Sequence, residues 1–151
     1  RIHEPLLAEF VEHLKKTARD SAFIGGTAVK EFETAFEKWL GNNGHVVSCA
    51  NGTDAIALPL MAWGVGPGDA VFCPSFSFVA TAEVIPWTGA TPVFVDVLPD
   101  TYNMDPASLE AAIAGVKKDG KLKPKVVIVP ATSLSMVLGT PITGTPASAR
   151  R

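Results

Sequence analysis

The residues best suited to chemistry lie in one short stretch, Cys49-Ala50-Asn51-Gly52-Thr53-Asp54. There an apolar run passes through a Gly directly into apolar residues spaced as in a helix. The N-terminus of a helix offers unpaired backbone N–H groups and about half a positive charge, and Gly lets an anion approach the backbone closely. The stretch therefore indicates a phosphate site at Gly52 and the residues after it.

The same stretch also fits an ordinary capped helix. Asn51 or Gly52 would be the N-cap, and Asp54 would lie in the first turn, where acidic side chains are favoured. Phosphate binding and simple capping both stay open from these residues alone, so the flanking sequence must decide between them.

The composition of the 151 residues is that of one ordinary globular domain. Apolar residues make up 47% and charged residues 19% of the chain, and the net charge is −2. Because this balance provides no basic surface, we expect neither nucleic acid nor a membrane as a partner. The sequence contains no apolar run as long as a membrane span and no recognisable signal peptide, so we expect a protein of the cytoplasm.

The sequence does not predict a metal site either. Cys49 and Cys73 lack CxxC spacing, and the histidines His3, His13 and His45 form no ligand cluster. Each cysteine ends an apolar run, so both are predicted to be buried, reduced thiols.

Two amphipathic helices are predicted first, from Leu6 to about Asp20 and from Thr27 to Leu40. After them, strands are predicted at 45–49, 70–73, 91–95 and 125–129, with intervening helices at 53–63, 78–87 and 106–116. This alternation indicates an α/β fold with a mostly parallel sheet flanked by helices. Ligands of such folds bind at the carboxyl ends of the strands.

Seven segments, taken in order, are similar to one protein family. They are Phe23-Ile24-Gly25-Gly26, 32–41, Asn51-Gly52-Thr53-Asp54-Ala55, Gly66-Pro67-Gly68-Asp69, 74–81, 89–96 and 100–106. Their order and spacing, from about Phe23 to Val129, resemble the N-terminal portion of the DegT/DnrJ/StrS-type nucleotide-sugar aminotransferases. These are pyridoxal phosphate (PLP) enzymes of fold type I.

The resemblance implies a cofactor site built from four residues. Gly52, Thr53 and the backbone N–H of Asp54 would bind the PLP phosphate. The Asp54 carboxylate, which a phosphate repels, would turn toward the helix cap or solvent. The ring of Phe78 would stack on the pyridine ring of the cofactor.

Other side chains near this site receive weaker assignments. Ser75 and Thr81 are lesser candidates to line it, and Phe76 is expected to be a core residue. Three further aromatic residues are expected in the core or at an interface: Trp63, Trp87 and Phe94.

The resemblance also implies what the complete protein would do. Residues 1–130 would form the N-terminal part of the large domain of a PLP-dependent transferase. The complete enzyme would be a homodimer and would transfer an amino group from an amino acid to a keto nucleotide sugar, in polysaccharide or secondary-metabolite biosynthesis.

Two features depart from the family pattern. None of the lysines matches the family's Schiff-base Lys motif, and the acidic partner of the pyridinium nitrogen is missing too, so no catalytic residue is assigned. Residues 131–151 are rich in turn-forming residues and lack acidic residues, which predicts a disordered or frameshifted tail. We therefore expect an incomplete family member that is inactive alone.

Two other functions stay open. The chain could be a non-catalytic phosphate-ligand-binding α/β module or pseudogene remnant, or an unrelated α/β nucleotide-binding domain. An Asp and a Lys in family context in the parent gene would favour the enzyme. A phosphate ligand other than PLP at Gly52 and Thr53 would favour the unrelated domain.

Overall fold

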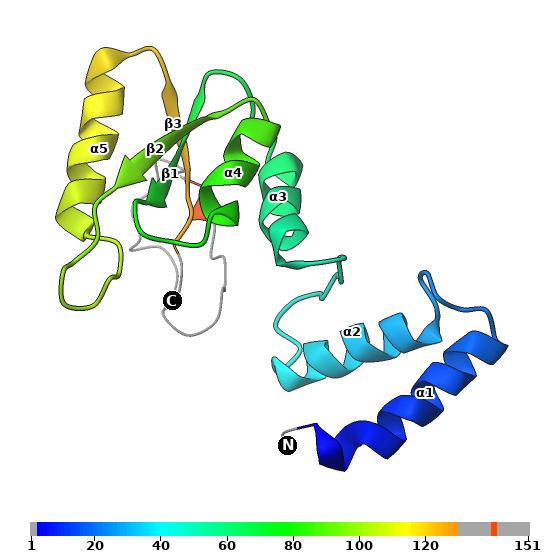
Figure 1. Ribbon diagram of the computed structural model, residues 1–151. Helices are drawn as coiled ribbons and strands as arrows, with labels where there is room; N and C mark the ends of the chain where they lie inside the picture. Colours follow the sequence, from blue (N-terminus) through cyan, green and yellow to red (C-terminus); the bar gives the residue numbers. More distant parts are fainter. Residues whose placement is uncertain (1–2, 130–139, 142–151) are drawn as a thin grey trace. The chain divides into compact units, whose positions relative to one another are not determined.

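The computed structural model describes residues 3–129 and 140–141 and divides the chain into two compact units, Arg1–Ser48 and Cys49–Arg151 (Figure 1). The first unit is helical: a 3-10 turn, η1 (Glu4–Leu6), leads into α1 (Leu7–Arg19), and α2 (Thr27–Trp39) follows. Both predicted N-terminal helices are therefore confirmed.

Gly26 begins the second of these helices as its N-cap. A Cβ at Gly26 would come within 2.5 Å of the Ala22 carbonyl oxygen, closer than atoms can approach. Any side chain would therefore force the turn between α1 and α2 to open.

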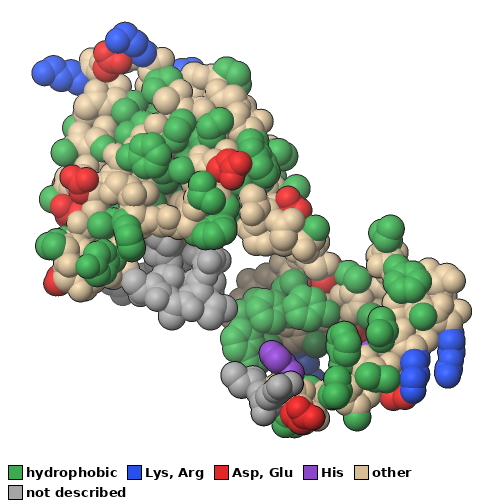
Figure 2. Space-filling model, in the orientation of Figure 1, with side chains coloured by type: hydrophobic (Ala, Val, Ile, Leu, Met, Phe, Trp, Pro, Cys, Tyr) green, Lys and Arg blue, Asp and Glu red, His purple; other side chains and the backbone are tan. Residues whose placement is uncertain are grey.

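The apolar side chains of α1 and α2 remain exposed. No residue of either helix is buried, and the side chains of Phe10 and Trp39 are 64% and 77% exposed. The rings of Phe32, Phe36 and Trp39 stack in series along α2, with centroids 5.7 and 5.4 Å apart. Figure 2 shows hydrophobic side chains gathered on the surface of this unit.

The second unit is an α/β layer. Its elements are α3 (Gly52–Ala62), β1 (Asp69–Pro74), α4 (Ala80–Trp87), β2 (Thr91–Val95), α5 (Pro106–Asp119), β3 (Lys123–Val127) and β4 (Thr140–Pro141). The sheet order is β2-β1-β3-β4; β1 pairs in parallel with β2 and β3, and the short β4 is antiparallel to β3. The predicted α/β fold with a mostly parallel sheet is confirmed.

The central strand β1 is buried on both faces. Val71 and Cys73 pack with Ile56 and Leu60 of α3 and with buried residues of α4, whereas Phe72 belongs to a second cluster on the other face. Alternate side chains of a strand point to opposite faces, which explains the division. Leu109, Ala112 and Ile113 of α5 pack against the second cluster, as their helical spacing predicts.

One predicted strand is wrong. Residues 45–49 form no strand in the described part of the chain. The N–H groups of Val46 and Ser48 instead donate to the carboxylates of Glu37 and Glu33 on α2, each at 2.8 Å. An apolar run becomes a strand only when another strand pairs with it, and here two helix side chains take its N–H groups.

The two cysteines also differ from expectation. Cys73 is fully buried, and burial raises the pKa of its thiol to about 11. Cys49 is exposed, because the segment that it ends is not incorporated in the sheet. The prediction of two buried thiols is therefore right for Cys73 and wrong for Cys49.

Neither a membrane-spanning helix nor a metal site is found among the described residues. They contain no helix that is both long and apolar enough to cross a membrane, and no group of three metal-ligating side chains. Of the predicted tail, 131–151, only Thr140–Pro141 is described. The rest lies outside the described residues, so the nature of the tail stays a prediction.

Candidate functional site

The N-terminus of α3 is capped by Asn51. Its backbone is extended, at φ −163° and ψ 174°, and its Oδ1 accepts a hydrogen bond from the Asp54 N–H at 2.9 Å. Its Nδ2 donates to Oδ2 of Asp54 at 3.1 Å. The Asp54 carboxylate is thus turned toward the cap, and its N–H is engaged.

Two N–H groups of this first turn remain available. Among the described residues, the backbone N–H groups of Gly52 and Thr53 have no hydrogen-bond acceptor. A Cβ added to Gly52 would meet no atom within 4 Å, so the space beside its backbone is open. The Thr53 hydroxyl is a third donor at the same turn. This donor set fits a phosphate group at the positive end of the helix dipole.

Phe78 lies in the loop between β1 and α4. Its side chain is 74% exposed, so the ring is free to receive a flat ligand on its face. At the start of the loop, the Ser75 N–H donates to the Val95 carbonyl at 2.8 Å. At its end, the hydroxyls of Ser77 and Thr81 lie 2.9 Å apart in a hydrogen bond. The sequence alone does not indicate a role for Ser77, because its hydrogen-bond partner is known only from the fold.

Phe76 is not the core residue that the sequence predicts. It is 64% exposed, and its ring lies against that of Tyr102, with centroids 5.3 Å apart. Trp63, Trp87 and Phe94 are likewise outside the core, which leaves the interface as their predicted place. The alternation of side chains between the two faces of the sheet ends where β1 ends. The spacing of apolar residues therefore does not predict which side chains of the following loop are buried.

The two segments of the candidate site lie at one edge of the sheet. Helices α3 and α4 pack together, and both begin on the side where β1 ends (Figure 1). The predicted residues Gly52, Thr53 and Asp54 therefore share the carboxyl edge of the sheet with Phe78. This is the edge at which α/β folds bind ligands.

The lysines of the second unit lie at the opposite edge. They lie in the last turn of α5, in the loop after it and in β3: Lys117, Lys118, Lys121, Lys123 and Lys125. The Lys125 Nζ lies 4.0 Å from Oδ2 of Asp69, at the start of β1. Among the described residues of this unit, no lysine amine is thus placed beside the candidate site.

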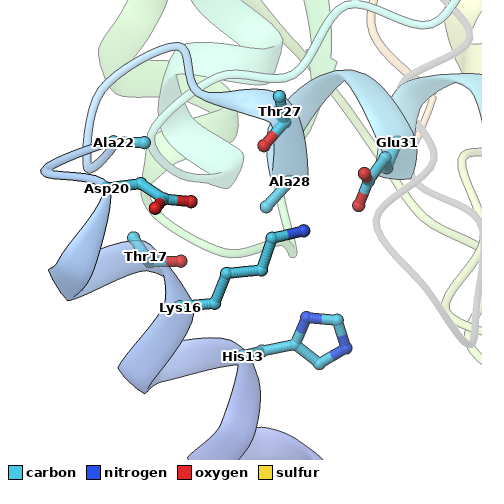
Figure 3. Close-up of a pocket in the computed structure, with 8 residues that line it drawn as sticks. All are labelled: His13, Lys16, Thr17, Asp20, Ala22, Thr27, Ala28 and Glu31. Carbon is cyan, nitrogen blue, oxygen red and sulfur yellow. The ribbon is translucent and has the colours of Figure 1, made fainter.

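A small hollow lies within the first unit, between α1 and α2 (Figure 3). Its volume is about 10 Å³, room for one water molecule. Its lining mixes cationic and anionic groups, including Lys16, Asp20 and Glu31. It is too small for a cofactor.

The sequence and the fold both match known aminotransferases. The model of the DegT/DnrJ/EryC1/StrS aminotransferase family matches residues 6–130. A UDP-2-acetamido-2-deoxy-3-oxo-D-glucuronate aminotransferase of Pseudomonas aeruginosa is 48% identical over 100 residues, which are 66% of this chain and 28% of that protein.

Two solved structures place the likeness in three dimensions. A DegT DnrJ EryC1 StrS aminotransferase of Brucella abortus has a TM-score of 0.80 and 49% identity, over 84% of this chain and 34% of its own. NtdA of Bacillus subtilis, solved with bound pyridoxamine phosphate (PMP), has a TM-score of 0.73 and 28% identity, over 83% and 27%. This chain spans about a third of these proteins. Over that third it has both their sequence pattern and their fold, and it belongs to the DegT/DnrJ/EryC1/StrS aminotransferase family.

Proposed function

We propose that this chain carries the cofactor-binding edge of a PLP-dependent aminotransferase that acts on keto nucleotide sugars. The observation that carries the proposal is the open, donor-rich first turn of α3 at the carboxyl edge of the sheet. Gly52 and Thr53 would bind the phosphate through their N–H groups and the Thr53 hydroxyl. The Phe78 ring would lie on the pyridine ring and fix its plane. Family membership argues against an unrelated nucleotide-binding domain.

Asp54 has a conditional place in this proposal. Its N–H is already bonded to Asn51 Oδ1, so it reaches a phosphate only after the Asn51 side chain swings away. We therefore assign the first contacts to Gly52 and Thr53 and a later one to Asp54.

When bound, PLP supplies the electron sink for amino transfer. The residues of this chain bind the phosphate, orient the ring and cover one of its faces. Proton transfer also needs a lysine amine near the ring, and the described lysines of this unit lie at the other edge of the sheet. We therefore propose that the chain alone binds the cofactor without catalysing transamination.

The substrate and the assembly are proposed for the complete protein. The name of the Pseudomonas relative, which acts on a UDP-linked 3-oxo sugar, supports a keto nucleotide sugar as amino acceptor. We propose an amino acid as the donor. The exposed apolar faces of α1 and α2 support a homodimer, because faces of this kind are usually covered by protein.

The direct test is a titration with PMP, which lacks the aldehyde and so cannot react with surface lysines. Thr53→Val keeps the side-chain volume and removes the hydroxyl. We expect it to weaken PMP about tenfold, since a hydrogen bond to a charged group is worth more than 1 kcal/mol. Thr91→Val, at the start of β2 on the opposite edge, is the control and should change nothing.

The same samples test the absence of catalysis. With PLP and glutamate, absorbance spectroscopy should detect no conversion of the cofactor to its amino form. Equal PMP affinity in Thr53→Val and the unchanged chain would contradict the phosphate site. Turnover together with a single lysine fixed by borohydride would contradict the proposed inactivity.

A further inference from the structure

Thr81 is the one buried polar side chain of the described residues, at 6% exposure. It lies on α4 among buried apolar neighbours, Ala80, Val84 and Ile85. A Val would fill the same volume without bringing a hydroxyl out of water. The hydroxyl of Thr81 has one side-chain partner, Oγ of Ser77, at 2.9 Å. That bond is what a Thr provides at this position and a Val would not.

The two partners of this bond lie on either side of Phe78 in the sequence. Ser77 precedes this residue, Thr81 follows it by one helical turn, and the Thr81 N–H donates to the Phe78 carbonyl at 3.0 Å. Val79 at the N-cap of α4 makes no side-chain hydrogen bond, so the Ser77–Thr81 bond is the side-chain bond that joins the loop to the first turn of α4. It thereby fixes the backbone from which the Phe78 side chain extends.

The ring of Phe78 has little else to hold it. It is 74% exposed and makes no aromatic contact with another ring among the described residues. The direction of an exposed ring is set by the backbone that carries it and by its rotamer. A ligand that stacks on such a ring binds more tightly when the ring is already in place, because less conformational entropy is lost on binding.

We propose that Ser77 and Thr81 form a positioning pair that holds Phe78 ready to stack on the pyridine ring of the cofactor. The inference rests on the proposed function, since it needs a flat ligand at this edge. It assigns no contact between either hydroxyl and the cofactor. The pair therefore affects affinity for a ring-bearing ligand and leaves affinity for bare phosphate unchanged.

The test compares PMP with inorganic phosphate, both titrated into the full chain. Thr81→Val should weaken PMP about fivefold, the size expected for one neutral hydrogen bond. Ser77→Ala should have the same effect, and the double variant should be no weaker than either single one. Thr81→Ser restores the hydroxyl and should restore affinity. Phosphate affinity should be equal in all five proteins.

Amide hydrogen exchange in the ligand-free chain gives a second readout. Thr81→Val should speed exchange at the backbone N–H of residue 81, whereas Thr81→Ser should not. Ser77 is exposed, so water can satisfy its hydroxyl after either change and the core of the unit stays packed.

Phe78→Ala separates the inference from the proposed function. If Phe78→Ala lowers the affinity for PMP and Thr81→Val does not, the positioning role of Ser77 and Thr81 is wrong and the proposed cofactor site is retained. If Phe78→Ala leaves PMP affinity unchanged, the stacking role is wrong and the pair has nothing to position. If Thr81→Val weakens PMP and phosphate equally, its effect is a general loss of structure, and the inference is overturned.

Discussion

At the scale of single residues, Asn51 and Asp54 have two functions that compete. Asn51 caps α3 through the Asp54 N–H, and a phosphate would seek the same N–H. The sequence leaves capping and phosphate binding open; the structure shows the capping, and phosphate binding at the same turn stays a proposal. Asn51 is the cap, while the N–H groups of Gly52 and Thr53 remain for an anion.

Asn51→Ala tests this division. Loss of the cap should lower the free energy of unfolding by about 1 kcal/mol, because the Asp54 N–H loses its partner. Phosphate affinity should not fall, since the freed N–H becomes available to the anion. Urea denaturation and a phosphate titration measure the two effects, and Asn51→Ser, which keeps a capping oxygen, is the control. If Asn51→Ala lowers both stability and phosphate affinity, the assignment of capping to Asn51 and of phosphate binding to Gly52 and Thr53 is contradicted.

At the scale of elements, the alternation of apolar runs and helical patterns predicts the α/β layer from the sequence. It could not predict the fate of residues 45–49. An apolar run looks the same whether or not a strand lies beside it, and Glu33 and Glu37, four residues apart on α2, reveal their partners only in the fold. Phe78 could be assigned only through the family resemblance, and Ser77 could not be assigned at all, because its partner is known only from the structure.

The hydrogen bonds between Glu33 of α2 and Ser48 should depend on pH. The Ser48 N–H and hydroxyl both donate to Oε1 of Glu33, and these bonds lower the pKa of its carboxyl from its ordinary value, with a smaller contribution from nearby Lys30. Because the pKa of Glu33 is lower in the folded than in the unfolded chain, the stabilisation is fully present above the unfolded pKa and is lost as the pH falls through the folded pKa. Protection of the Ser48 amide should follow this course in hydrogen exchange.

Variants of α2 identify the group responsible. Glu33→Gln still accepts a hydrogen bond but cannot titrate, so the change in Ser48 protection with acid should disappear. Glu31→Gln, on the same helix, should behave like the unchanged chain. Loss of protection in acid that persists in Glu33→Gln would assign the effect to another carboxyl.

At the scale of the whole molecule, the chain spans about a third of the length of its relatives. It exposes apolar surface on both helices of its first unit. The stacked rings of α2 include Trp39, whose side chain is 77% exposed. Exposed apolar surface of this kind favours association between protein molecules.

We therefore expect the chain to self-associate. Light scattering over a range of concentrations should show species larger than one chain, and Trp39→Gln should shift the distribution toward the monomer. Trp87→Gln, in the second unit, tests whether any exposed tryptophan has this effect. A monodisperse monomer at all concentrations would contradict the association.

The central claim is that the first turn of α3 and the ring of Phe78 bind one cofactor at the carboxyl edge of the sheet. The most direct measurement is a map of amide chemical shifts by NMR during titration with PMP. We expect the amides of Gly52, Thr53 and Phe78 to shift together with a single affinity, and inorganic phosphate to shift only those of Gly52 and Thr53. Shifts confined to other parts of the chain, or different affinities at α3 and Phe78, would contradict it.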